Sequence, residues 1–135
     1  MLDLKASDIK SLQILLVEDN RINQMVASRL LEKMGHKVAI ADNGKIAVEW
    51  IANNKADLIF MDLQMPIMDG LTAAKEIRKW EAIQQLNPIP IIAATANTSE
   101  EDKSNAFAAG MNDFLSKPLR GETLRAAILR QIQTA

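Results

Sequence analysis

Short apolar runs alternate along the chain with segments in which apolar residues recur at helical spacing. The five runs are Ile14–Val17, Val38–Ile40, Leu58–Met61, Ile89–Ala94 and Phe114–Leu115. Because successive positions within a run are apolar, each run predicts a strand that is covered on both faces, whereas a half-exposed strand would alternate. Strands of this kind, separated by helical segments, predict an α/β fold in which a doubly wound parallel sheet has helices on both faces.

The segments that follow the runs predict helices. In the first segment, we expect an apolar face toward the sheet, formed by Ile22, Met25, Val26, Leu30 and Met34. Gly35 then supplies the left-handed residue that often ends a helix. Further helices are expected over residues 44–53 and 70–80, the latter capped by Asp69, and another opens at residues 98–102. The last helix has a stripe formed by Leu124, Ala127, Ile128 and Ile132.

Length, composition and charge limit the class of protein. The 135 residues fit a single domain, which we place at residues 12–135 after a lead or linker of residues 1–11. Hydrophobic residues make up 48% and charged residues 24%, as in folded domains. A net charge of −1 gives no positive field for nucleic acid or anionic lipid. Because the chain has no cysteine and no long apolar span, we expect a cytoplasmic location and no membrane contact.

Polar residues lie directly after four of the predicted strands or, for Lys117, one residue farther on. They are Glu18 and Asp19, Asp62, Thr95, and Lys117. Ligands bind beyond the carboxyl ends of the strands in doubly wound sheets, so we expect these side chains to share one edge. Each residue alone has an ordinary explanation, such as a helix cap or a solvated lysine. Their joint occurrence at successive strand ends favours a single site.

The residue types of this set predict phosphoryl chemistry. Clustered carboxylates repel one another unless a cation neutralises them, and Mg²⁺ prefers oxygen ligands. We expect Glu18, Asp19, Asp62 and the backbone carbonyl of Gln64 to supply those ligands. A carboxylate can then accept a phosphoryl group as an acyl phosphate. The Lys117 ammonium and a hydroxyl at Thr95 would contact the phosphoryl oxygens.

From Leu12 to about Gln133, the sequence resembles the receiver domain of two-component response regulators. The segments that carry the resemblance are residues 16–20 (LVEDN), 61–70 (MDLQMPIMDG), 94–96 (ATA) and 116–119 (SKPL). The resemblance implies a flavodoxin-like sheet of five strands in the order 2-1-3-4-5, with five helices. It also implies that Asp62 accepts phosphate from a phosphohistidine, that Glu18 and Asp19 hold Mg²⁺, that Thr95 is the switch hydroxyl and that Lys117 contacts the phosphate.

The same resemblance implies roles for further residues. Phe114 stands where the family has an aromatic residue that turns inward when the switch hydroxyl moves, although core packing also explains its ring. Gln64 and Asn97 would tune the lifetime of the phosphoryl group, with loop polarity as the ordinary alternative. A cis bond is expected at Lys117–Pro118. Phosphorylation would change the surface of the fourth helix, fifth strand and fifth helix.

Two other classes of protein are compatible with the topology. A flavodoxin-like cofactor binder needs hydroxyl and glycine residues after the first strand, where Glu18 and Asp19 would repel a phosphate. An aspartate-nucleophile phosphohydrolase pairs its nucleophile with an acid two residues later, where this chain has Gln64. His36 follows Gly35 on the opposite edge of the sheet, so we interpret it as an ordinary loop residue.

Within the receiver family, two origins remain open. Residues 61–66 and 110–114 look like receivers of hybrid sensor histidine kinases, which favours a domain cut from such a kinase over a free-standing response regulator. The expected partner is a sensor histidine kinase or a histidine phosphotransfer protein. We expect no nucleic-acid partner, a monomer or weak dimer, and a domain that catalyses its own phosphorylation and dephosphorylation.

Overall fold

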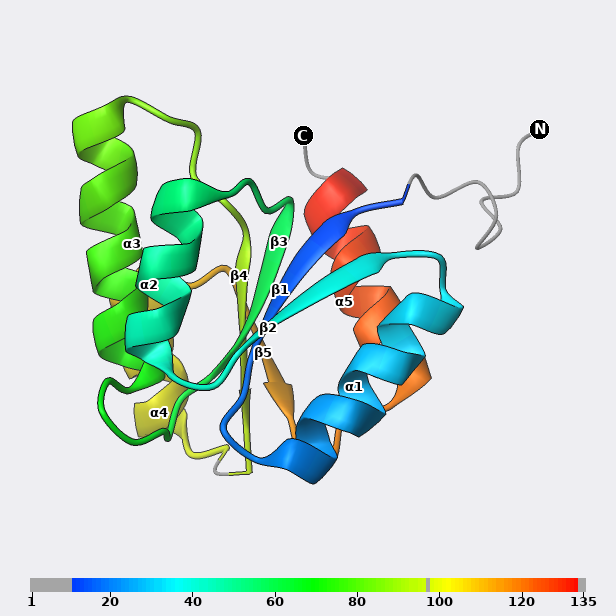
Figure 1. Ribbon diagram of the computed structural model, residues 1–135. Coiled ribbons are helices and arrows are strands. Elements are labelled where there is room, and N and C mark those ends of the chain that lie inside the picture. Colours follow the sequence, from blue (N-terminus) through cyan, green and yellow to red (C-terminus); the bar gives the residue numbers. More distant parts are fainter. Residues whose placement is uncertain (1–10, 97, 134–135) are drawn as a thin grey trace.

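In the computed structural model of the protein, of which residues 11–96 and 98–133 are described, one parallel sheet forms the centre (Figure 1). The strands are β1 (Gln13–Val17), β2 (Lys37–Ala41), β3 (Leu58–Asp62), β4 (Ile91–Thr95) and β5 (Asp113–Ser116). Their order is β2-β1-β3-β4-β5, and every neighbouring pair is parallel. The structure therefore confirms the predicted flavodoxin-like topology.

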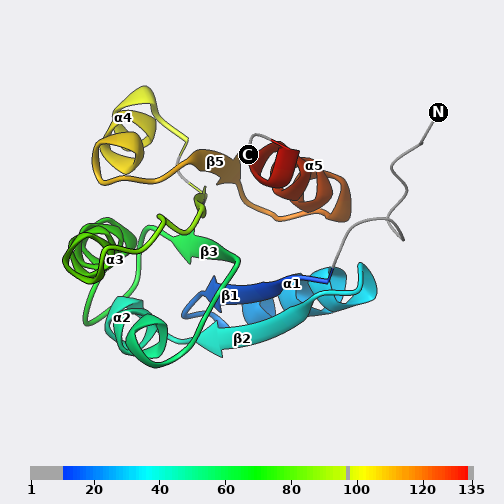
Figure 2. The ribbon, with the colours of Figure 1, turned by 90° about the horizontal axis from the view of Figure 1, so that it is seen from above.

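Helices cover both faces of the sheet. They are α1 (Arg21–Lys33), α2 (Gly44–Asn53), α3 (Gly70–Gln84), α4 (Glu100–Ala108) and α5 (Gly121–Gln133). Helices α1 and α5 lie on one face, and α2, α3 and α4 lie on the other (Figure 2). In the part of the chain that the structure describes, no helix has the length and apolar character needed to cross a bilayer.

The core explains why the strand sequences are apolar at successive positions. Leu15 and Val17 of β1 pack in the cluster under α2, α3 and α4, while Ile14 and Leu16 pack in the cluster under α1 and α5. All four side chains are buried. A strand between two helical layers has no solvent-facing side, so both sets of alternate side chains leave water.

The predicted element ends differ from the observed ones by a few residues. Strand β4 begins at Ile91 rather than at residue 89, in keeping with the missing N–H of Pro90. Helix α3 continues to Gln84 instead of residue 80. Ser99 caps α4, which begins at Glu100, within the expected opening at residues 98–102. Asp69 caps α3 as predicted, by accepting a hydrogen bond from the Thr72 N–H at 2.7 Å.

Two backbone predictions are confirmed. Gly35, which follows the C-cap residue Met34 of α1, has a φ of 98°, in the left-handed region that glycine favours. The Lys117–Pro118 bond is cis.

The predicted inward face of α1 is wrong for Ile22, Met25 and Val26, whereas Leu30 and Met34 do pack against the core. The helix instead buries Gln24, Ala27 and Leu31 against the sheet. Ile22, Met25 and Val26 are 71%, 47% and 49% exposed, and Leu30 and Met34 are only partly buried. The apolar spacing predicted the wrong rotation of α1 about its own axis. A small alanine and a hydrogen-bonded glutamine face the sheet, while larger apolar side chains face outward. The α5 stripe is correct for Leu124, Ala127 and Ile128 but not for Ile132, which is 40% exposed.

His36 lies in the turn between α1 and β2, as predicted, but it is not an ordinary loop residue. It is 5% exposed, and its Nδ1 accepts a hydrogen bond from the Leu12 N–H at 3.1 Å. Burial lowers the pKa of this imidazole below its usual value. The accepted hydrogen bond requires Nδ1 to be unprotonated, so the fold favours neutral His36.

Candidate functional site

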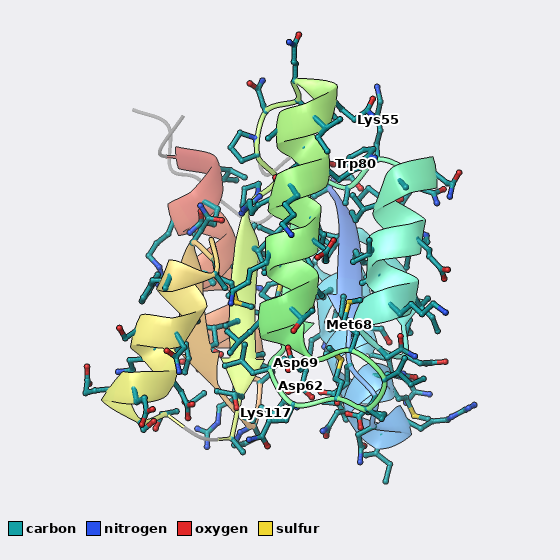
Figure 3. The ribbon with its side chains drawn as sticks, turned by 90° about the vertical axis from the view of Figure 1, so that its left-hand side faces the viewer. Lys55, Asp62, Met68, Asp69, Trp80 and Lys117 are labelled. Atoms are coloured by element: carbon teal, nitrogen blue, oxygen red, sulfur yellow. The ribbon has the colours of Figure 1, made fainter. Side chains whose placement is uncertain are left out.

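The predicted polar residues converge where the strands end. Lys117 follows β5, and its Nζ lies 2.7 Å from Glu18 Oε1 beyond β1 and 3.0 Å from Asp62 Oδ2 at the end of β3. Figure 3 shows Asp62 and Lys117 at one end of the molecule, with Lys55 and Trp80 at the other. The predicted meeting of Glu18, Asp62 and Lys117 at a single sheet edge is therefore correct.

The charge of Lys117 is set by two opposing effects. Burial by itself would lower the pKa of its ammonium. The hydrogen bonds and the negative charges of Glu18 and Asp62 outweigh that effect and raise the pKa above its usual value. The Lys117 ammonium therefore stays protonated at neutral pH, and its charge partly neutralises the two carboxylates.

Asp62 is fixed by the strand that carries it and by the loop that follows. It pairs with Ala94 of β4, and its side chain is 7% exposed. The backbone N–H of Gln64 donates to Asp62 Oδ1 at 3.2 Å. A Cβ at Gly70 would clash with the Asp62 carbonyl oxygen, so the first residue of α3 can approach Asp62 only because it has no side chain.

Glu18 and Asp19 have different surroundings. Glu18 is buried, and its Oε2 accepts a hydrogen bond from the Asn20 N–H at 3.0 Å while Oε1 contacts Lys117. Asp19 is exposed. Asn20 ends the loop by capping α1 through the Asn23 N–H, at 3.0 Å. The loop therefore holds one acid inside the site and leaves the next one open to solvent.

These acids form a group that can hold a metal ion. One carboxylate oxygen from each of Glu18, Asp19 and Asp62 lies within 4.8 Å of the others. The three carboxylates outnumber the Lys117 ammonium that contacts two of them, so the group favours a further cation. Oxygen donors of this kind fit Mg²⁺, which prefers carboxylates and retained waters to nitrogen or sulfur.

Thr95 and Phe114 lie near this group on the neighbouring strands. Thr95 is buried at the end of β4, one residue beyond the partner of Asp62, and its carbonyl accepts the Lys117 N–H at 2.9 Å. Phe114 pairs with Ala93, is half-buried and packs against the core on the α4 side. The Lys103 Nζ of α4 lies 5.9 Å from the centroid of the Phe114 ring. The switch roles of Thr95 and Phe114 stay predictions.

Of the two residues predicted to tune the lifetime of the phosphoryl group, Gln64 lies among the described residues. Gln64 is exposed two residues after the end of β3, beside the acidic group, and its contribution of a backbone carbonyl to a metal stays a prediction. Asn97 lies outside the described residues.

Sequence reasoning missed an apolar surface beside the site. Ile22, Met25 and Val26, which we call the α1 apolar surface, are exposed at the start of α1. Next to it is a cavity of about 470 Å³ with a mostly apolar lining, formed by Glu18, Asn23, Val26, Ala27, Ala96, Lys117, Pro118 and Leu119. The apolar spacing of α1 was visible in the sequence, but it was assigned to the core.

Sequence reasoning also missed Gln24. This side chain is 9% exposed, and its Nε2 donates to the Glu18 carbonyl oxygen at 2.6 Å and to Asp42 Oδ1 at 2.8 Å. The signal available in the sequence was a glutamine one helical turn after Asn20, between apolar positions.

Comparison with known proteins gives a consistent match. A family model described as the response regulator receiver domain matches residues 14–129. Hybrid signal transduction histidine kinase K of Dictyostelium discoideum is 45% identical over 133 residues, which are 96% of this chain and 11% of that protein. Sensor histidine kinase GacS of Pseudomonas protegens is 39% identical over 118 residues, which are 87% of this chain and 13% of that protein. The chain thus spans only a small part of these relatives.

Similar solved structures are also receiver domains. The receiver domain of a sensor histidine kinase from Pseudomonas aeruginosa, with a magnesium ion in its active site cleft, is 39% identical with a TM-score of 0.80, covering 90% of this chain and 97% of that one. The receiver domain of the Saccharomyces cerevisiae response regulator Ssk1, crystallised with the histidine phosphotransfer protein Ypd1, is similar to the chain. For that co-crystal structure the identity is 37% and the TM-score 0.84, with 88% of this chain and 87% of the other covered. These matches favour a receiver over a cofactor binder or a phosphohydrolase.

Proposed function

The chain belongs to the response regulator receiver domain family, and from this premise we propose that Asp62 accepts a phosphoryl group from a phosphohistidine. The observation that carries the proposal is the contact of Lys117 with both Glu18 and Asp62 at one sheet edge. The buried carboxylate of Asp62 thereby has a cation beside it and two further acids near it. That arrangement suits a reaction in which negative charge must be brought to a carboxylate.

In the proposed reaction, a carboxylate oxygen of Asp62 forms a bond to phosphorus. The bond from phosphorus to the donor imidazole nitrogen breaks, and its electron pair stays on that nitrogen. The Lys117 ammonium would contact a phosphoryl oxygen, and the Thr95 hydroxyl another. When bound by Glu18, Asp19 and Asp62, Mg²⁺ would neutralise charge on the phosphoryl oxygens. The protein contributes mainly position and electrostatics.

Phosphoryl labelling tests the acceptor. With a small-molecule phosphodonor and Mg²⁺, mass spectrometry of the wild-type chain should show one added phosphoryl group, and Asp62→Asn should show none. Asp69→Asn is the matched control, because Asn caps helices as well as Asp and that variant keeps its α3 cap. Labelling that persists in Asp62→Asn, or that disappears equally in Asp69→Asn, would contradict the assignment.

We propose that a histidine phosphotransfer protein or sensor histidine kinase docks on the α1 apolar surface. This surface adjoins the cavity that reaches Lys117, so a protein seated there has its histidine beside the site. The co-crystal structure of Ypd1 with a receiver supports such a partner. The similarity to hybrid kinases supports an origin in such a kinase, with residues 12–135 as the receiver and residues 1–11 as a linker. A cytoplasmic location fits the cysteine-free composition.

We propose that the signal leaves through α4, β5 and α5. Phe114 lies on β5 between the core and α4, so a change in its position would alter the α4 side of the molecule. Thr95, on the adjacent strand, would couple that movement to the phosphoryl group. Gln64 and Asn97 remain the proposed lifetime residues, and the domain is proposed to act as a monomer or weak dimer.

A further inference from the structure

Gln24 links two loops through one amide group. Its Nε2 donates to the carbonyl oxygen of Glu18 in the β1–α1 loop and to Asp42 Oδ1 in the β2–α2 loop. Asp42 is exposed, whereas Gln24 is buried on the inner side of α1. A glutamine held against a sheet by two short hydrogen bonds has little rotational freedom. A shift of α1 would therefore move the Glu18–Asp19 peptide group as well.

The β2–α2 loop also contacts the loop that follows β3. The Gly44 N–H donates to the Met68 carbonyl oxygen at 3.0 Å, and a Cβ at Gly44 would lie 2.6 Å from that oxygen. Met68 is in the same loop as the residues after Asp62, near the lower end of α2 in Figure 3. Residues 42–44 therefore contact the loop that follows Asp62 directly and the β1–α1 loop through Gln24, although they contribute no ligand of their own to the acidic group.

From these contacts we infer that Gln24 is a positioning residue for the metal site. The Glu18 N–H is already bonded to the Ala41 carbonyl oxygen at 3.0 Å, and the Glu18 side chain is bonded to Lys117 and Asn20. The Gln24 amide fixes the remaining polar group of Glu18, its carbonyl oxygen, and with it the plane of the peptide that leads to Asp19. Exposed Asp19 is thereby kept within binding distance of Asp62. Without this bond, cation binding must order the peptide at an entropic cost.

The inference rests on the proposed function in that Glu18, Asp19 and Asp62 hold Mg²⁺. The variant that tests it is Gln24→Met, which keeps an unbranched side chain of similar length and removes the donors. Isothermal titration with Mg²⁺ should give a Kd raised about tenfold or more, the usual effect of losing a group that orients a ligand. Phosphorylation should fall at limiting Mg²⁺ and recover at saturating Mg²⁺, which a general loss of structure would not do. Gln84→Met, at an exposed position of α3, is the matched control.

A second pair of variants avoids the buried position. Asp42→Ala removes the anchor of the Gln24 amide, and Asp42→Asn removes the charge but keeps an oxygen acceptor. The Mg²⁺ Kd should rise more in Asp42→Ala than in Asp42→Asn. Amide hydrogen exchange at Asp19 and Asn20, measured without metal, should quicken in Gln24→Met and Asp42→Ala.

Asp19→Asn distinguishes a failure of the Gln24 positioning role from a failure of the metal site. If it weakens Mg²⁺ binding while Gln24→Met and Asp42→Ala bind like the wild type, the positioning role is overturned and the metal site stands. If Asp19→Asn also binds Mg²⁺ like the wild type, the proposed metal site itself fails.

Discussion

The Lys117 Nζ lies closer to Glu18, at 2.7 Å, than to Asp62, at 3.0 Å. Lys117 therefore bridges an acid proposed to bind metal and the carboxylate proposed to accept phosphate. Its raised pKa keeps this bridge charged at neutral pH. A metal ion and the Lys117 ammonium would consequently share the carboxylates of Glu18 and Asp62, while both attract a phosphoryl group.

Substituting Lys117→Met should therefore separate metal binding from phosphoryl transfer. Removing one positive charge from the neighbourhood of the acids should tighten Mg²⁺ binding roughly tenfold, because a unit charge about 6 Å from a divalent ion repels it by about 1.4 kcal/mol at the dielectric of water. Phosphorylation at saturating Mg²⁺ should slow by about a hundredfold, the usual effect of losing one donor to developing charge. Calorimetry and rates of labelling measure the two effects. Lys55→Met, at the opposite end of the molecule, is the control, and weaker Mg²⁺ binding in Lys117→Met would contradict this repulsion.

Substituting Met25→Glu on the α1 apolar surface should impair transfer from a protein donor. A charge at the centre of an apolar contact is costly to desolvate, so the ratio of the rate with a phosphohistidine protein to the rate with a small-molecule donor should fall about tenfold. Stopped-flow or gel assays with both donors give this ratio. Phe107→Glu, at a 51% exposed position on α4, is the matched control. An equal fall of the ratio in both variants would place the docking surface elsewhere.

Substituting Gly70→Ala should destabilise the fold, because the new Cβ would clash with the backbone of Asp62 and Leu63. Overpacking of this kind costs about 1–3 kcal/mol in the free energy of unfolding, measured by urea denaturation. Gly121→Ala is the control, since its Cβ would meet only Leu30 and Met34 atoms at 3.8 and 3.9 Å. That variant should match or slightly exceed the wild-type stability. Equal stability of the two variants would show that the loop after β3 yields to the added methyl group.

Substituting His36→Asn should make stability less sensitive to mild acid. Burial lowers the pKa of His36 in the folded state, so its contribution to stability is fully present above the unfolded pKa of about 6.5 and is lost as pH falls toward the folded value. Asn keeps an oxygen that can accept the Leu12 N–H but does not titrate. Urea denaturation at about pH 7.5 and about pH 5.5 should show a larger loss of unfolding free energy in the wild type. An equal loss in both proteins would mean that His36 titrates normally.

The acidic and basic residues of the site could be found from the sequence because each lies at the end of a strand or just beyond it. A strand covered on both faces is visible as an apolar run, and its last residue fixes which edge of a parallel sheet the next side chain occupies. Glu18, Asp62 and Lys117 were located in this way. The buried face of α1 was harder to predict from the sequence, because several of its large apolar side chains face solvent and a glutamine faces the sheet.

The sequence by itself determined the order of elements, the parallel sheet and the meeting of the acids with Lys117, because apolar runs and strand ends are local signals. Only the tertiary structure decided the rotation of α1, the burial of His36 and the double hydrogen bond of Gln24. These depend on which partner atoms lie across the sheet or the neighbouring loop, such as the Asp42 carboxylate for Gln24 and the Leu12 N–H for His36. Distances between residues far apart in the chain follow from packing, which no local pattern encodes.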